Sequence, residues 1–272
     1  MEHTELAGKI DAGKIDAQKP DANKIEAVDR AEGSPSPIRT ILMLGFWTAA
    51  LPFAALTGIP WFYLTRNVNF LYKSCMWAAF TGPRLAGVRV QTIGLEKIDT
   101  ARTYIFMSNH ISNLDPPITL PLIPRRTSVM VKKELFKVPI LNTIMHAGSL
   151  VPVDRGNRDA GISAVRDSVK AIRGEQINMT IYVEGHRSFD GKLLPFKKGP
   201  FYLAEECQMP VVPITISGTE LLMPKARFGI RPGLVTVRFH DAIEPENFGS
   251  RDDLMAKVRA AINSGLPKEM QE

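Results

Sequence analysis

The sequence predicts an α/β domain preceded by hydrophobic helices that associate with a membrane. From residue 87 onward, short apolar runs alternate with amphipathic helical patterns, which is typical of an α/β fold. Before that point, residues 40–65 contain no charged side chain, and a second apolar stretch covers residues 70–80. We therefore divide the chain into a tail with a linker at residues 1–37, membrane-associating helices at 38–84 and the α/β domain at 85–272.

The composition limits the class of protein. With 272 residues, the chain is long enough to bury one substantial core. A net charge of +6 favours an anionic partner, either a phosphate-bearing ligand or a membrane surface. No nucleic-acid-binding fingerprint is present, so we expect no nucleic acid partner. Cys75 and Cys207 lie far apart without metal-ligand spacing, which favours a reducing cytoplasmic environment over a disulfide scaffold or a zinc site.

The first residues carry a degenerate five-residue repeat. It runs from residue 8 to 27 and combines Lys, Asp or Glu, and Ala with Gly or Pro. A period of five matches neither a helix nor a strand, so this segment is expected to be disordered or transiently helical. No apolar stretch lies within the first thirty residues, so it does not read as a secretory signal. Residues 33–37, rich in Ser and Pro, are expected to form a linker.

Residues 40–65 exceed the length of about 20 apolar residues that a bilayer-spanning helix needs. Pro52 and Pro60 argue against one straight helix, and Lys73 interrupts the second apolar stretch. The two stretches could form a transmembrane helix with an interfacial helix, or a helical hairpin that dips into one leaflet. The alternative is a buried core helix of a soluble protein.

Within the α/β domain, the apolar runs predict strands and the amphipathic runs predict helices. The expected strands cover residues 88–93, 104–108, 128–131, 150–153, 179–183, 211–216 and 234–239. The expected helices cover residues 133–147, 159–173, 200–206 and 252–262.

A histidine and an aspartate follow the second expected strand. His110 and Asp115 are five residues apart, a spacing that separates them on a straight strand and sets them about 140° apart on a helix. Asn109 and Ser112 favour a turn, which would let the two side chains meet. Asp115 could then accept a hydrogen bond from one ring nitrogen while the other takes a proton from a substrate hydroxyl. The alternative is a structural loop histidine with a helix-capping aspartate.

Further charged groups come at the ends of other expected strands. Arg155 follows strand 150–153 and could hold a phosphate, or could pair with the aspartate before it. Glu184, Gly185 and Arg187 follow strand 179–183, where the glycine allows a sharp turn and the arginine adds positive charge. Lys132 follows strand 128–131. Together these residues indicate an anion-binding site beside the histidine.

Four blocks of residues occur here in the order found in glycerolipid acyltransferases. They are Asn109-His110-x4-Asp115, Arg155 after its strand, Glu184-Gly185-x-Arg187-Ser188, and the strand that contains Pro210 and Pro213. The chain most closely resembles the bacterial 1-acyl-sn-glycerol-3-phosphate acyltransferases over about residues 85–220. The resemblance implies a mixed sheet flanked by helices, with a glycerol-3-phosphate acyltransferase-like fold. Tyr182-Val183 and His186 depart from the family's usual Phe-Pro and Thr.

The resemblance also implies an activity and a set of site residues. The expected reaction moves a fatty acyl group from acyl-CoA or acyl-carrier protein to the sn-2 hydroxyl of lysophosphatidic acid, without a metal or a cofactor. His110 would be the general base and Asp115 its orienting partner. The residues expected to bind substrate are Asn109, Lys132, Arg155, Glu184, Gly185, Arg187 and Ser188. The implied location is the inner membrane, among membrane lipids, with the catalytic domain on the cytoplasmic side.

Three alternatives remain open at this point. The same chemistry could use glycerol 3-phosphate, another lysophospholipid or an acylated amino-acid lipid as acceptor. The chain could instead be a non-catalytic membrane protein that binds anionic lipids through its basic surface. A metallohydrolase that uses His110 and Asp115 is a third reading.

Overall fold

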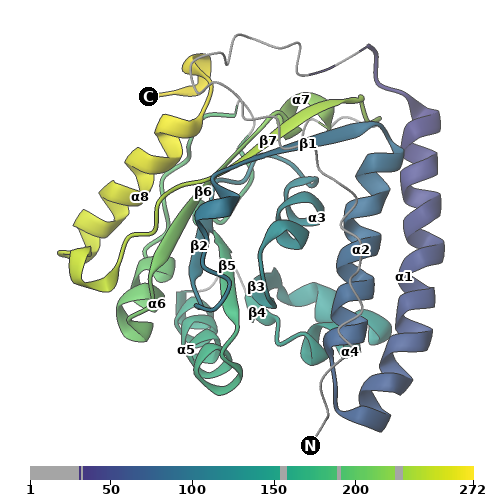
Figure 1. Cartoon of the computed structure of the whole chain (residues 1–272), viewed down its shortest axis with the longest axis horizontal. Helices are drawn as coiled ribbons and strands as arrows, with labels where there is room; N and C mark the ends of the chain where they lie inside the picture. Colours follow the sequence, from purple (N-terminus) through teal and green to yellow (C-terminus); the bar gives the residue numbers. More distant parts are fainter. Residues whose placement is uncertain (1–30, 32, 154–157, 189–190, 224–228) are drawn as a thin grey trace, which may run out of the picture.

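The computed structural model describes residues 31, 33–153, 158–188, 191–223 and 229–272. Within this part of the chain, one sheet of seven strands lies between two layers of helices (Figure 1). The strands are β1 Val88–Ile93, β2 Ile105–Ser108, β3 Thr127–Lys132, β4 Val151–Val153, β5 Asn178–Tyr182, β6 Val211–Ser217 and β7 Gly233–Phe239. Their order is β1-β7-β6-β2-β5-β3-β4, and every neighbouring pair is parallel except β6 with β7. The sheet is therefore mixed, as expected.

Two helical layers cover the sheet. The longer helices are α1 Pro37–Thr65, α2 Asn69–Leu85, α4 Pro139–Ala147, α5 Arg158–Glu175, α6 Gly199–Cys207 and α8 Arg251–Gly265. Two short helices, α3 Asp115–Thr119 and α7 Thr219–Leu222, follow β2 and β6. Helices α5, α6 and α8 cover one face, whereas α1 to α4 lie on the other (Figure 1).

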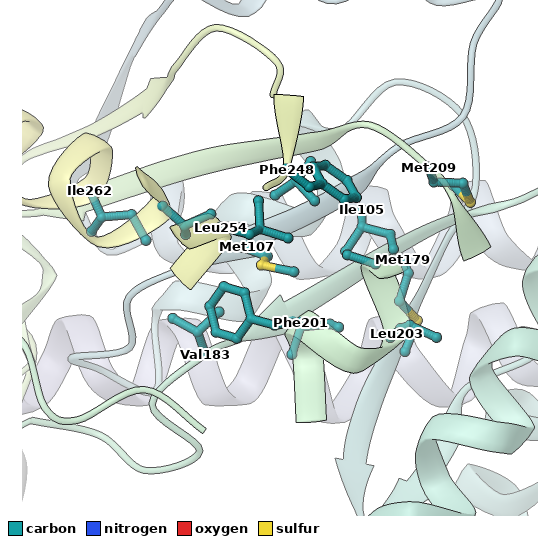
Figure 2. Packing of buried hydrophobic residues seen from close by; sticks show 14 of the residues in the cluster. Ile105, Met107, Met179, Val183, Phe201, Leu203, Met209, Phe248, Leu254 and Ile262 are labelled. Atoms are coloured by element: carbon teal, nitrogen blue, oxygen red, sulfur yellow. The ribbon is translucent and has the colours of Figure 1, made fainter. Parts of the chain in front are cut away.

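Strand β2 lies at the centre of the sheet and joins both cores. All four of its residues are buried. Ile105 and Met107 pack toward Phe201 of α6 and Leu254 of α8 (Figure 2), whereas Phe106 points to the opposite core. The continuous apolar run in the sequence reflects this burial on two faces, which is typical of the inner strands of parallel sheets. The loop after β2 thus starts from the most constrained strand of the fold.

Helices α1 and α2 form a closely packed antiparallel hairpin. A Cβ atom added at Gly58 would come within 2.7 Å of Leu71, and one added at Gly82 within 2.3 Å of the Trp47 indole. The Trp47 indole N–H donates to the carbonyl oxygen of Ala78 at 2.9 Å. The outward face of the hairpin stays apolar and exposed at Ile41, Leu42, Phe53, Leu56, Leu64, Phe70 and Trp77. In the described part of the chain, α1 alone has the length and apolar composition to cross a bilayer, and 22% of its most apolar window is buried.

Three expectations about local structure need correction. Helix α1 is one continuous helix despite Pro52 and Pro60. The expected helix at 133–147 is divided, because the residue before a proline avoids helical backbone angles. Val138 accordingly has φ −84° and ψ 115°, which separates a 3-10 turn at Lys133–Lys137 from α4. The expected linker is tied to the sheet end, since the Ser36 backbone N–H donates to the Ile230 carbonyl oxygen at 3.0 Å.

The expected tail at residues 8–27 lies outside the described residues. The remaining expected strands and helices all occur, with ends that agree within three residues.

Candidate active site

The candidate site lies where three parallel strands end. Strands β5, β2 and β6 are neighbours, and they end at Tyr182, Ser108 and Ser217. Ligand groups in α/β folds gather at the carboxyl ends of such strands. The histidine loop, residues 109–114, leaves β2 at this edge and leads directly into α3.

The histidine and the aspartate of the first motif are in contact. His110 Nδ1 lies 2.7 Å from Asp115 Oδ2, and the two side chains are 9% and 0% exposed. Because an ionised carboxylate only accepts hydrogen bonds, His110 Nδ1 carries the hydrogen in this pair. Nε2 is then the ring nitrogen that can accept a proton. The turn expected in the histidine loop thus brings together two residues that a strand or a helix would separate.

The Asp115 carboxylate also accepts hydrogen bonds from three other donors. Oδ2 accepts from the backbone N–H groups of Ile111 at 2.7 Å and Ser112 at 2.8 Å. Oδ1 accepts from the hydroxyl of Thr219 at 2.6 Å. Thr219 is the first residue of α7 and was not among the expected site residues. Together with His110 Nδ1, these groups give the fully buried carboxylate four hydrogen-bond partners, with at least one on each oxygen.

The ring of His110 rests on an aromatic side chain. The Tyr182 ring stacks on the imidazole with ring centroids 4.3 Å apart and an angle of 27° between the planes. Burial raises the pKa of the Tyr182 hydroxyl well above its ordinary value, and the Asp115 charge adds to this effect. The ring therefore stays neutral and supplies a flat surface for the imidazole.

Glu184 supports the site by accepting hydrogen bonds from two backbone N–H groups. Its Oε1 accepts from the His110 backbone N–H at 2.8 Å, and its Oε2 accepts from the Leu194 backbone N–H, also at 2.8 Å. Burial raises the pKa of the Glu184 carboxyl from 4.5 to about 7 and outweighs these two N–H groups, which lower it. Oε1 therefore holds the histidine loop and Oε2 holds the backbone at Leu194, whereas the substrate contact expected for Glu184 stays a prediction.

Asn109 is also a structural link. Its amide nitrogen donates to the carbonyl oxygen of Ile216 at 2.9 Å, and its amide oxygen accepts from the N–H of Ile216 at 2.8 Å. The residue is fully buried. Asn109 therefore fastens the histidine loop to β6, and its expected contact with substrate stays a prediction.

The loop that follows β5, residues 183–188, supports the histidine loop from the other side. The Ser188 backbone N–H donates to the His110 carbonyl oxygen at 2.9 Å. Gly185 has φ +72°, and a Cβ there would press on the Lys197 side chain at 3.3 Å, so glycine suits the position. Arg187 is partly exposed in the same loop.

Lys132, another expected binding residue, does not join this cluster. Lys132 is exposed at the end of β3, where it lies 3.7 Å from Glu134. Arg155 lies outside the described residues.

Replacing Glu184 with glutamine is expected to flatten the dependence of stability on pH. The folded state holds the Glu184 proton up to about pH 7, whereas the carboxyl has its ordinary pKa of 4.5 in the unfolded chain. Stability is therefore present below pH 4.5 and is lost as pH rises to about 7, by an amount on the order of 3 kcal/mol. Glu184→Gln removes this slope, and below pH 5 it lowers stability by about 1–3 kcal/mol, because its amide NH₂ faces an N–H donor.

Urea unfolding between pH 4 and pH 8 measures both effects. The exposed Glu246→Gln serves as the matched control and should follow the parent protein. If Glu184→Gln keeps the slope of the parent protein, the carboxyl of Glu184 is not the titrating group.

Comparisons with known proteins agree with this geometry. A model of the family described as Acyltransferase matches residues 89–217. The chain is 31% identical to the 1-acyl-sn-glycerol-3-phosphate acyltransferase of Limnanthes alba over 211 residues, which cover 77% of this chain and 74% of the relative. It is 30% identical to the human 1-acyl-sn-glycerol-3-phosphate acyltransferase beta over 61% of this chain and 60% of that protein.

A solved structure is similar over most of its length. It is the crystal structure of the 1-acyl-sn-glycerophosphate (LPA) acyltransferase PlsC from Thermotoga maritima. The two chains share 27% identity and a TM-score of 0.71, and the match covers 84% of this chain and 93% of the other.

Proposed function

The chain belongs to the 1-acyl-sn-glycerol-3-phosphate acyltransferase family, and from this premise we propose that it acylates the sn-2 hydroxyl of lysophosphatidic acid. The acyl donor is a thioester, acyl-CoA or acyl-carrier protein, and the product is phosphatidic acid. The observation that carries the proposal is the 2.7 Å contact between His110 Nδ1 and Asp115 Oδ2 at the end of β2. That contact sets up Nε2 as a base, as acyl transfer to a hydroxyl requires.

The reaction follows from this arrangement. His110 Nε2 takes the proton of the lysolipid hydroxyl while the hydroxyl oxygen attacks the thioester carbonyl carbon. The new C–O bond forms, the C–S bond breaks, and the imidazolium returns its proton to the leaving thiolate. Asp115 stabilises the imidazolium and holds its Nδ1–H in place. A thioester is already activated, so this scheme uses no covalent enzyme intermediate.

Basic side chains would hold the phosphate of the acceptor. Arg187 and Ser188 stand in the loop that touches the His110 backbone, and Lys132 is exposed at the same edge of the sheet. Arginine binds phosphate with two parallel N–H donors, and lysine adds a mobile positive charge. The contribution of Arg155 is proposed from its place in the second motif alone.

Apolar surfaces suit the acyl chains and the bilayer. An apolar cavity lies between α2, β3 and α4, where Leu71, Cys75, Val129 and Ile144 are among its lining residues. The exposed apolar face of the α1–α2 hairpin would sit in lipid, which places the site near its membrane-borne substrate. We place the protein at the inner membrane, with the α/β domain on the cytoplasmic side.

One assay tests donor and acceptor together. The full chain, purified in detergent or lipid vesicles, is given labelled palmitoyl-CoA or palmitoyl-acyl-carrier protein. The acceptors are lysophosphatidic acid, glycerol 3-phosphate and lysophosphatidylcholine, and a His110→Ala variant reports dependence on the base. Histidine-dependent label in phosphatidic acid is the expected result.

Label in another product would keep the reaction class and replace the acceptor. The absence of transfer from both donors to all three acceptors would overturn the enzymatic proposal. It would favour a non-catalytic protein that binds anionic lipids.

A further inference from the structure

A buried threonine contacts the carboxylate that orients the histidine. The Thr219 hydroxyl donates to Asp115 Oδ1 at 2.6 Å, and both residues are fully buried. The other three donors to Asp115, including His110 Nδ1, bind Oδ2. Among the described residues, the hydrogen bond to the second oxygen, Oδ1, therefore comes from Thr219.

The donors are distributed unevenly between the two oxygens of Asp115, and this gives Thr219 a distinct role in orienting the carboxylate. A carboxylate held through a single oxygen can still rotate about its Cβ–Cγ bond, because that torsion has a broad energy profile. Rotation moves the lone pairs of Oδ2 away from the Nδ1–H direction of His110. A donor on Oδ1 fixes the plane of the carboxylate and so fixes the direction of the hydrogen bond to the imidazole.

The position of Thr219 is itself held firmly. Gly218 precedes it with φ +98°, and a Cβ at Gly218 would come within 2.4 Å of the Leu234 carbonyl oxygen, so only glycine fits this turn. At the other end of α7, the Ser112 hydroxyl donates to the Met223 carbonyl oxygen at 2.9 Å. Helix α7 is thus fixed at both ends, by the close approach of Gly218 to β7 and by the hydrogen bond from Ser112 of the histidine loop.

We propose that Thr219 is a positioning residue for acyl transfer, the outer member of a Thr219–Asp115–His110 hydrogen-bonded chain. The inference rests on the proposed function of the site. Thr219 touches neither substrate nor product in this scheme. It acts through Asp115 on the orientation of the His110 ring.

Three variants separate the hydroxyl from the rest of the side chain. Thr219→Val keeps the shape and removes the donor, Thr219→Ser keeps the donor and removes the methyl group, and Thr215→Val is the matched control. Thr215 is a buried threonine on β6 whose hydroxyl donates to the Ile262 carbonyl oxygen at 2.8 Å, on the face covered by α8. Thermal unfolding of each variant gives the folded fraction by which turnover is normalised.

The expected result is a change in kcat alone. Thr219→Val should lower kcat about tenfold, the order expected for one hydrogen bond to a charged group. The KM values for the thioester and the lysolipid should stay within about twofold, because binding groups are untouched. Thr219→Ser should restore kcat to within about threefold of the parent protein, and Thr215→Val should leave it unchanged. A loss confined to stability would indicate a structural role and overturn the proposal.

A second measurement does not depend on turnover. The Nδ1–H proton of His110 is expected to give a sharp downfield NMR signal in the parent protein and in Thr219→Ser. In Thr219→Val the signal should broaden or disappear as the carboxylate rotates. An unchanged signal overturns the proposal even if the acceptor or donor of the reaction proves different. Should Thr219→Val fail to fold, Thr219→Ala, which sets no methyl group against Oδ1, takes its place.

Discussion

Replacement of His110 by alanine is expected to lower kcat by roughly 10²–10⁴-fold, the contribution of a positioned general base. The ring makes two kinds of contact, the Asp115 hydrogen bond and the stack on Tyr182, and neither is needed to hold the histidine loop. The loop keeps its backbone bonds to Glu184 and Ser188 in the variant. We therefore expect a folded protein that binds lysophosphatidic acid normally and transfers acyl groups slowly.

Single-turnover kinetics with labelled thioester, together with equilibrium binding of the lysolipid, measure the two effects separately. His146→Ala is a matched control, because that histidine is exposed on α4 and belongs to no part of the site. Near-normal turnover in His110→Ala would exclude the general-base role. Loss of lysolipid binding in the same variant would mean that the His110 ring contributes to binding of the lysolipid.

Replacement of Asp115 by asparagine is expected to lower turnover while leaving the stability of the fold nearly unchanged. An asparagine oxygen can take the place of Oδ2 and accept from His110 and the two backbone N–H groups. Its NH₂ group would face the Thr219 hydroxyl, which can turn and accept. The fold should therefore persist, whereas the lost negative charge no longer stabilises the imidazolium. We expect kcat to fall by roughly 10²–10⁴-fold with little change in melting temperature.

Asp115→Ala should behave differently, because it leaves four donors without an acceptor in a buried site. Each unsatisfied donor costs about 1–3 kcal/mol, so this variant should unfold at a clearly lower temperature. Calorimetry on both variants, with the exposed Asp167→Asn as control, distinguishes the two changes. Equal stability of Asp115→Ala and the parent protein would contradict the assignment of Asp115 as the acceptor of all four bonds.

The sequence predicted those parts of the site that are local. His110 and Asp115 lie five residues apart with turn-forming neighbours, so their contact follows from loop chemistry. Thr219 is 104 residues from Asp115, and a threonine after a glycine carries no pattern that points to a remote carboxylate. Glu184 was expected to bind substrate because the family resemblance places it in the glycerol-phosphate site. Its hydrogen-bond partners are backbone N–H groups. Nearly every residue carries such a group, so the sequence cannot indicate which of them will bind the carboxylate.

The fold, like the site, could be predicted from the sequence only where local patterns determine it. Apolar runs mark the strands because each inner strand is buried on two faces, but they say nothing of the order in which seven strands pair. Helix α1 continues through Pro52 and Pro60, where propensity alone argues for a break. Its packing against α2 at Gly58 and Gly82 outweighs the two lost backbone hydrogen bonds. Tertiary contacts of this kind have no signal within a short window of residues.

The pairing of β2 has a consequence for the order of events during synthesis. Both neighbours of β2, strands β5 and β6, come later in the chain, and contacts between distant residues form late in folding. The apolar α1–α2 hairpin leaves the ribosome before the strands that it covers, so it emerges before any of them has a partner. On the proposed membrane location, the hairpin would therefore enter the bilayer while the α/β domain is still incomplete. The proposed acyl transfer requires Thr219 and a paired β6, so membrane attachment would precede activity in every new molecule.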